Sequence, residues 1–241
     1  MKKVVVTGSA SGIGFYTASK LNESGYDVTG IDLVKSLALD KSITQVECDL
    51  LDSERTESVF RSIGDFDIAV NCAGVPGQRK ALTEFSKQEF EQSFSAVFFP
   101  TFNAMQQELR LLEKHKIPSG DKKKIINITS YTAHVGGKNM AAYSSAKAAL
   151  INLTKVAAVE HSETVQVNSI SPATIDTPMI RKKYLSAWPD YSEAYLSGDC
   201  GKVEDVFAAI DMMIHNNFMT GYDLVLDGGY SADFSLNLKP V

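Results

Sequence analysis

Hydrophobic positions along this chain fall into two kinds of segment. Short runs rich in β-branched residues are typical of buried strands, and longer stretches with apolar residues every three or four positions are typical of amphipathic helices. The short runs predict seven strands, at Lys3–Val6, Asp27–Ile31, Thr44–Cys48, Asp67–Asn71, Lys124–Thr129, Val165–Ile170 and Leu224–Leu226. The longer stretches predict helices near Gly12–Ser24, Ser53–Ser62, Lys87–Lys114, Ala141–Ser162 and Lys202–Asn216.

This alternation of strands and helices indicates the fold class. Strands separated by helices pair in parallel, and the helices then cover both faces of the sheet. Right-handed crossovers give a doubly wound, Rossmann-type α/β fold of about seven strands. No internal repeat, low-complexity tract or linker interrupts the 241 residues, so we expect one domain over 1–241.

Composition and charge narrow the partners. Hydrophobic residues make up 44% and charged residues 22% of the chain, and the net charge is −5, which gives no basic field for nucleic acid or acidic lipid. The Lys122–Lys124 run is interpreted as a solvated loop before a strand. No apolar stretch approaches the ~18 residues of a membrane span. We therefore expect a cytoplasmic protein that binds neither nucleic acid nor membrane.

Cysteine and histidine spacing does not indicate a metal site or a disulfide framework. The chain has three cysteines and four histidines, at Cys48, Cys72 and Cys200 and at His115, His134, His161 and His215. None forms a CxxC pair or a mixed cluster, so no metal is expected. Only His134, between Ser130 and Tyr143, is placed to border a pocket.

The first predicted strand leads directly into a glycine-rich turn. Thr7-Gly8-Ser9-Ala10-Ser11-Gly12-Ile13-Gly14 follows a strand and opens a helix. Glycines permit a tight turn and let backbone N–H groups approach a pyrophosphate at the helix N-terminus. A plain strand-to-helix turn is the alternative, but the position in the first βαβ unit favours a dinucleotide loop, with Gly8, Ser11, Gly12, Ile13 and Gly14 at the ligand.

The second predicted strand leads to Asp32, followed by Leu33. A carboxylate at this point accepts hydrogen bonds from the adenosine ribose hydroxyls and repels a 2′-phosphate. Ser9, Ala10, Leu33 and Val34 include no arginine that could bind that phosphate. This pattern favours NAD over NADP, whereas an exposed aspartate without a ligand is the alternative.

Tyr143 and Lys147 lie four residues apart at the start of a predicted helix, so they share one helical face. An unperturbed tyrosine has a pKa of about 10 and needs help to exchange protons at neutral pH. An ammonium beside the phenol favours the tyrosinate, so we expect Lys147 to lower the pKa of Tyr143. Ser130 stands at the end of a preceding strand.

Together these motifs resemble those of the short-chain dehydrogenase/reductases over nearly the whole chain. The ordered matches are TGxxxGxG at Thr7–Gly14, Asp49-Leu50, Asn71-Cys72-Ala73-Gly74, Ser130, and YxxxK at Tyr143–Lys147. The resemblance implies that Asp49 and Leu50 border the adenine and that Asn71, Ala73 and Gly74 support the cofactor. It further implies that Ser130 hydrogen-bonds the reacting oxygen and that Lys147 holds the nicotinamide ribose.

The segment Asn168–Met179 is similar to the family segment that lines the nicotinamide amide. The resemblance implies cofactor contacts for Pro172, Ala173, Thr174, Ile175 and Thr177. Alanine stands where the family usually has glycine after the proline, so either φ is negative at Ala173 or the turn is modified. Thr220–Gly229 is similar to the family's last strand and loop, which often form subunit contacts.

Val97 departs from the family pattern. Family members usually carry an asparagine there, which holds a water in the proton relay from the catalytic lysine, and Pro100 stands where glycine is common. Valine cannot hydrogen-bond a relay water. Either another group substitutes, or proton exchange is slower, or this member has lost efficient catalysis.

The stretch 179–200 is expected to form a substrate lid. It carries the large apolar or aromatic residues Tyr184, Leu185, Trp188, Tyr191, Tyr195 and Leu196. They could cover an apolar or ring-containing substrate, or they could pack the lid onto the body or a second subunit.

These observations predict an oxidoreductase that transfers a hydride between NAD(H) and a carbonyl or secondary alcohol of a small molecule, with Tyr143 as the acid/base. A dinucleotide-binding regulatory or sensor protein on the same fold is the chief alternative. Lyase or dehalogenase chemistry would need an altered lysine position or glycine loop. By resemblance, and because Leu236–Val241 leaves apolar residues that need cover, a homodimer or homotetramer is expected. Substrate identity is not encoded in these motifs.

Overall fold

The computed structural model describes residues 1–113, 122–184 and 187–232. Its centre is a parallel seven-stranded sheet in the order β3-β2-β1-β4-β5-β6-β7. The strands are β1 (Lys3–Thr7), β2 (Asp27–Asp32), β3 (Thr44–Glu47), β4 (Ile68–Asn71), β5 (Lys123–Ile128), β6 (Val165–Pro172) and β7 (Asp223–Leu226). This order confirms the predicted doubly wound α/β fold. Strands β1 to β3 are added toward one edge of the sheet and strands β4 to β7 toward the other, so the strand order switches between β1 and β4.

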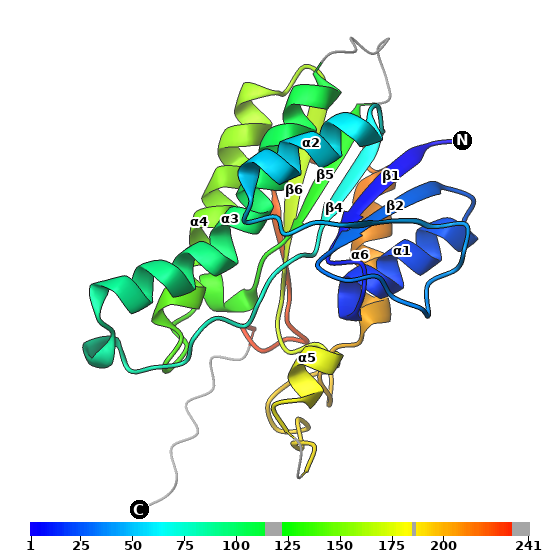
Figure 1. Cartoon of the computed structure of the whole chain (residues 1–241). Coiled ribbons are helices and arrows are strands. Elements are labelled where there is room, and N and C mark those ends of the chain that lie inside the picture. Colours follow the sequence, from blue (N-terminus) through cyan, green and yellow to red (C-terminus); the bar gives the residue numbers. More distant parts are fainter. Residues whose placement is uncertain (114–121, 185–186, 233–241) are drawn as a thin grey trace, which may run out of the picture.

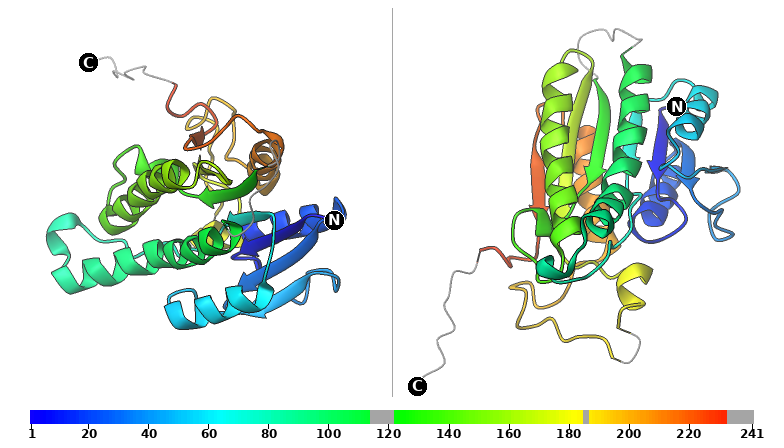
Figure 2. Two further views of the ribbon diagram at one scale, coloured as in Figure 1. Left: turned by 90° about the horizontal axis from the view of Figure 1, so that it is seen from above. Right: turned by 60° about the vertical axis from the view of Figure 1, so that its left-hand side comes forward.

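Helices cover both faces of the sheet (Figure 1, Figure 2). One layer contains α2 (Ser53–Ile63), α3 (Lys87–Leu112) and α4 (Ala141–Glu160), and the other contains α1 (Gly12–Glu23) and α6 (Val203–His215). The short helix α5 (Pro178–Arg181) lies beyond the ends of the strands. Two 3-10 turns, η1 (Leu82–Glu84) and η2 (Tyr131–Ala133), complete the described elements.

Strand residues alternate between two apolar cores because successive side chains point to opposite faces. In β1, Val4 and Val6 join the cluster beneath α1 and α6, whereas Val5 joins the cluster beneath α2, α3 and α4. All three valines are almost fully buried. Both faces being covered explains why the strands read as continuous apolar runs.

The predicted elements match the observed ones to within about two residues, and the differences are local. β6 continues to Pro172, two residues beyond the prediction, and α3 ends at Leu112, two residues before it. The short η1, η2 and α5 were not predicted. His115, Leu185 and the apolar segment 236–241 fall outside the described residues, so the expectations placed on them are not addressed.

The lysine run was wrongly interpreted as a solvated loop. Lys123 and Lys124 belong to β5, and Lys124 is only 3% exposed. Its ammonium donates to the carbonyl of Asn216 at 2.9 Å, the residue that ends α6. A cation there stabilises the negative end of the helix dipole.

Among the described residues no helix is long and apolar enough to span a membrane.

Candidate active site

The carboxyl ends of the central strands meet at one edge of the sheet, where a cleft of about 300 Å³ opens. Its lining includes eleven of the predicted cofactor residues: Gly8, Ser11, Gly12, Ile13, Gly14, Asp32, Leu33, Asp49, Leu50, Ala73 and Gly74. Thr177, from the segment after β6, is the twelfth predicted cofactor residue in this lining, and its Cγ2 would lie 3.5 Å from a Cβ on Gly12. Ligands of open α/β sheets bind at this switch point between β1 and β4.

The N-terminus of α1 faces this cleft without a capping side chain. Ser11 occupies the N-cap position but makes no side-chain hydrogen bond to the helix, and the first turn contains no acidic residue. The first N–H groups of the helix therefore lack a side-chain acceptor, as a pyrophosphate-binding terminus requires. A Cβ on Gly14 would collide with the carbonyl oxygen of Gly8, so the helix can approach the strand this closely only with glycine.

Asp32 ends β2 with its carboxylate fixed by backbone donors. The Ala10 N–H donates to Oδ2 at 2.9 Å, and the Leu33 N–H donates to Oδ1 at 2.7 Å. These bonds tie the glycine loop to the end of β2. The carboxylate is therefore held at the lining of the cleft, and it retains lone pairs for further donors.

A hydrogen bond from a side chain of α3 holds the loop after β3. The buried Asn103 donates through Nδ2 to the carbonyl oxygen of Leu50 at 2.7 Å. Asp49 accepts the N–H of Leu51 at 2.9 Å. Asn103 was not foreseen as part of this wall, because a single asparagine within a long helix carries no distinguishing sequence signal.

Ser130, Tyr143 and Lys147 come together beside the cleft. Ser130 caps η2 at the end of β5, and its hydroxyl accepts the N–H of Thr132. Lys147 is 5% exposed, and its ammonium lies 5.9 Å from the centre of the Tyr143 ring. That ammonium donates to the carbonyl of Ile128 at 2.9 Å. A Cβ on Gly74 would lie 3.7 Å from Lys147 Nζ, so the trio adjoins the cofactor cleft.

The electrostatics of Tyr143 differ from the prediction. Burial raises the pKa of Tyr143, while interaction with the Ser130 hydroxyl and the positive charge of Arg79 lower it. Burial also lowers the pKa of Lys147 to about 8. The expectation that Lys147 lowers the pKa of Tyr143 is therefore wrong, because desolvation of the phenol outweighs the nearby charges. Arg79 was not anticipated from the sequence.

Val97 places methyl groups where the family pattern expects the amide of an asparagine. It is fully buried on α3, and its Cγ2 would lie 3.5 Å from a Cβ on Gly77. Ser93, one turn earlier, accepts the N–H of Gln78 at 2.9 Å. α3 continues through Pro100 without a break. Proline has no N–H, so the carbonyl of Ala96 receives no helical hydrogen bond from that position.

The predicted nicotinamide segment continues from β6. Asn139 is the one non-glycine residue with positive φ among those described, so the backbone of Ala173 stays outside the left-handed region. The Ala173 N–H donates to the carbonyl of Leu226 at 2.9 Å. Ile175 is 6% exposed and packs in the core. Eight of the predicted site residues do not line the cleft described above: Asn71, Ser130, Tyr143, Lys147, Pro172, Ala173, Thr174 and Ile175.

The aromatic residues of 179–200 form a connected series. Ring centres lie 6.1 Å apart for Tyr184 and Trp188, 5.7 Å for Trp188 and Tyr191, and 5.8 Å for Tyr191 and Tyr195. Tyr195 is 9% exposed, and its hydroxyl accepts the N–H of Thr174 at 3.3 Å. This end of the segment packs on the body, as one of the two interpretations expected.

A buried hydrogen-bond network holds the side chain of Asn71. Asn71 Nδ2 donates to Glu108 Oε2 at 2.9 Å and to Asn127 Oδ1 at 3.0 Å, and Asn127 donates to Thr154 at 2.9 Å. Glu108 is fully buried, and its Oε1 has no hydrogen-bond partner among the described residues. Burial raises the pKa of Glu108 to about 8. The sequence did not single out Glu108.

His134 contacts an acidic residue of β7. Its Nε2 lies 2.8 Å from Asp223 Oδ2 and 3.2 Å from the Ser171 hydroxyl. The Asp223 carboxylate also accepts from the hydroxyls of Ser169 and Thr129. This cluster ties the turn after Ser130 to β7. His134 does not line the cofactor cleft.

A doubly wound parallel sheet with a cleft at its carboxyl edge, lined by the glycine loop, defines a Rossmann-type α/β protein. Within that class, a family model described as short chain dehydrogenase matches residues 2–187. The chain therefore belongs to the short chain dehydrogenase family of oxidoreductases, whose members metabolise small molecules.

Relatives and solved structures agree with this assignment. The chain is 30% identical to Carbonyl reductase [NADPH] 2 of Sus scrofa, with 95% of this chain and 96% of that protein covered. It is 30% identical to L-2,3-butanediol dehydrogenase of Corynebacterium glutamicum, with 95% and 98% covered.

Aldohexose dehydrogenase of Thermoplasma acidophilum in ligand-free form superposes with a TM-score of 0.88 at 25% identity, covering 99% of this chain and 97% of that one. ElxO with NADP bound superposes at 0.87 and 27% identity, covering 97% and 100%. Relatives of this fold thus include NADP-binding proteins.

Proposed function

We propose that this protein transfers a hydride between NAD(H) and a carbonyl or secondary alcohol of a small molecule. The observation that carries the proposal is the convergence of Ser130, Tyr143 and Lys147 beside the cleft under the uncapped end of α1. A bound nicotinamide would supply or accept the hydride. The glycine loop, Asp32 and the Asp49-Leu50 turn would hold the adenosine and pyrophosphate.

Proton transfer falls to the side chains of this chain. The Tyr143 hydroxyl would give or take the proton on the reacting oxygen, and the Ser130 hydroxyl would orient that oxygen. Burial raises the pKa of Tyr143, so positive charge close to the phenol would favour its ionised form. Lys147, held between Ile128 and Gly74, would bind the nicotinamide ribose and return protons.

NAD rather than NADP is the proposed cofactor, because Asp32 would repel a 2′-phosphate. Backbone N–H groups hold its carboxylate in place, so the side chain cannot swing away without losing these hydrogen bonds. NADH should bind at least tenfold more tightly than NADPH, a difference of about 1.4 kcal/mol. Fluorescence titration of both cofactors measures this ratio. Asp32→Asn removes the charge at constant shape and should reduce the ratio, whereas equal affinities in the wild type would contradict the assignment.

Turnover is tested by a screen of NAD and NADH against small alcohols and ketones. A second candidate is a dinucleotide-binding sensor that has lost turnover. Val97 favours it, because this fully buried side chain cannot hydrogen-bond a relay water. Tight NADH binding with no turnover of any compound would favour the sensor. Cofactor-dependent oxidation of a secondary alcohol that requires Tyr143 would favour the enzyme.

A further inference from the structure

The segment 75–80 after β4 carries two adjacent cations with different surroundings. The Lys80 ammonium pairs with the Glu89 carboxylate at 2.9 and 3.0 Å, and this pairing and Ser86 lower the pKa of Glu89 to about 2. Arg79 is exposed, and within the described part of the chain its guanidinium makes no hydrogen bond or ion pair. The charge of Lys80 is therefore neutralised locally, and the charge of Arg79 is not.

The backbone fixes Arg79 beside the catalytic tyrosine. On one side of it, the Gln78 N–H donates to Ser93 at 2.9 Å. On the other side, the Lys80 N–H donates to the carbonyl of Asn139 at 3.2 Å, in an isolated bridge with Met140 just before α4. A Cβ on Gly77 would lie 3.3 Å from the Cβ of Tyr143.

The positive charge of Arg79 acts on the catalytic phenol. It opposes the rise that burial causes in the pKa of Tyr143, and it contributes to the lowered pKa of Tyr184. Lys183, which donates to the Tyr184 hydroxyl at 3.1 Å, lowers the pKa of Tyr184 most strongly. Because the backbone of Gly77 packs against Tyr143, the Arg79 side chain starts two residues from that contact.

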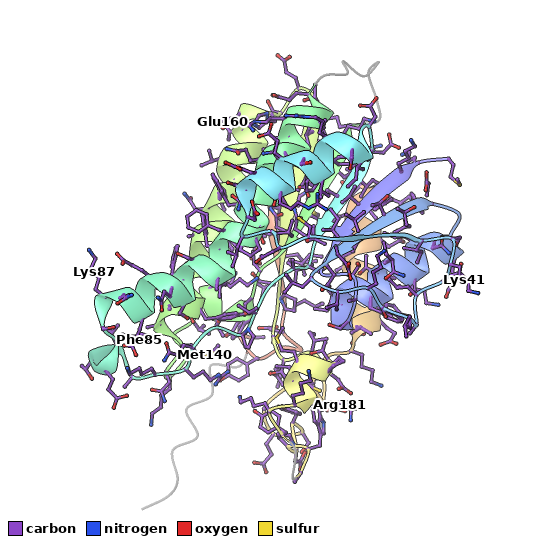
Figure 3. The ribbon with its side chains drawn as sticks, viewed as in Figure 1. Lys41, Phe85, Lys87, Met140, Glu160 and Arg181 are labelled. Atoms are coloured by element: carbon purple, nitrogen blue, oxygen red, sulfur yellow. The ribbon has the colours of Figure 1, made fainter. Side chains whose placement is uncertain are left out.

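Another cation of the lid is already satisfied. Arg181 forms a bidentate pair with Asp176, at 2.6 and 2.5 Å, and lies 4.9 Å from the Trp188 ring. Met140 and Arg181 both lie at the end of the molecule where the strands terminate, opposite Glu160 (Figure 3). Arg79, next to the Lys80–Met140 bridge, and Lys183, two residues after Arg181, are thus positive groups at this end of the molecule without an acidic partner among the described residues.

A guanidinium of this kind matches an oxyanion, because its planar donors bind two oxygens of a carboxylate or phosphate at once. We propose that Arg79 recognises an oxyanionic group of the substrate, so that the favoured substrates are small hydroxy or oxo compounds carrying a carboxylate or phosphate. This inference rests on the proposed hydride transfer at Tyr143. Neutral alcohols of the same skeleton should be poorer substrates.

Matched substrate pairs test the inference. The acids 3-hydroxybutyrate and glycerol 3-phosphate are compared with butane-1,3-diol and glycerol as neutral counterparts, which separates carboxylate from phosphate recognition. The wild type should show at least a tenfold higher kcat/KM for one acid than for its neutral counterpart. Arg79→Gln should reduce that preference at least tenfold, mainly through KM. Arg79→Lys should keep part of it, and Arg61→Gln, a cation on the far end of α2, should keep all of it.

A binding measurement separates this inference from the proposed function. Trp188 is the single tryptophan of the chain, so its fluorescence reports the lid when the NADH complex is titrated with acetate or methyl phosphate. Arg79→Gln should weaken this binding at least fivefold. Turnover of alcohols with no acid preference, or a preference unchanged in Arg79→Gln, would overturn the inference alone. Arg79-dependent anion binding without any turnover would overturn the proposed function and leave the anion site in place.

Discussion

The two halves of the proposed site, one for the cofactor and one for the substrate, are built from different groups. The cofactor half uses backbone: the uncapped first turn of α1, the close contact of Gly14 with Gly8, and the N–H groups that hold Asp32. The substrate half uses side chains that arrive from separate segments, among them Tyr143 and Arg79. Backbone sites follow from a short local motif, whereas side-chain sites depend on how distant segments meet.

The most severe test of this division is Tyr143→Phe. The change removes the phenolic hydroxyl and keeps the ring, so the chemical step should slow by roughly 10² or more. NADH affinity should stay within about twofold, because the backbone donors of the cofactor half are untouched. Single-turnover kinetics and NADH titration measure the two quantities. Tyr222→Phe, at an exposed tyrosine, is the control. Normal turnover in Tyr143→Phe would refute the proposed mechanism.

What the sequence could predict follows the same division. The sequence predicted seven strands, five helices and eleven of the residues that line the cleft between Gly8 and Gly74, because hydrophobic period and glycine spacing are local signals. Arg79 was missed because its meaning comes from the bridge between Lys80 and Met140, two positions far apart in the chain. The pKa of Tyr143 was misjudged because spacing on a helix does not report burial.

The buried carboxyl group of Glu108 predicts that the stability of the protein depends on pH. Its pKa of about 8 lies above the usual 4.5, so between these values the folded state holds a proton that the unfolded state has lost. Its contribution to stability is complete at low pH and declines as pH rises through about 8. From pH 6 to pH 8 the free energy of unfolding should fall by about 2 kcal/mol on this account.

Glu108→Gln cannot ionise and should escape this decline. Urea unfolding of the wild type and the variant at several pH values measures the difference, which should widen toward pH 8. The control Glu57→Gln changes an exposed carboxylate paired with Arg61 and should follow the wild type. Parallel curves for the wild type and Glu108→Gln would show that the buried carboxyl is already ionised at pH 6.

The smallest expected effect concerns Val97, where the substrate half lacks the amide that the family pattern expects. Val97 is fully buried close to Gly77, and the Lys147 ammonium donates directly to the carbonyl of Ile128. The loss of one water-mediated link corresponds to about 0.5–1.5 kcal/mol, or roughly a factor of 2–13 in rate. Val97→Asn should therefore raise turnover several-fold by restoring a group that can hold a relay water.

A solvent isotope effect on the wild type should shrink in Val97→Asn, because proton return would no longer limit the rate. Val97→Ala is the matched control: it opens space for water without adding a hydrogen-bonding side chain, so a gain of the same size there would show that space alone matters. No gain in Val97→Asn, with an unchanged isotope effect, would indicate that another group already carries the relay. Ser93 and Ser95 are candidates, as is the Ala96 carbonyl, which Pro100 leaves without its helical donor. Because Ala96 and Pro100 both line the cleft, a relay through the Ala96 carbonyl would make the proline a compensation for the missing asparagine.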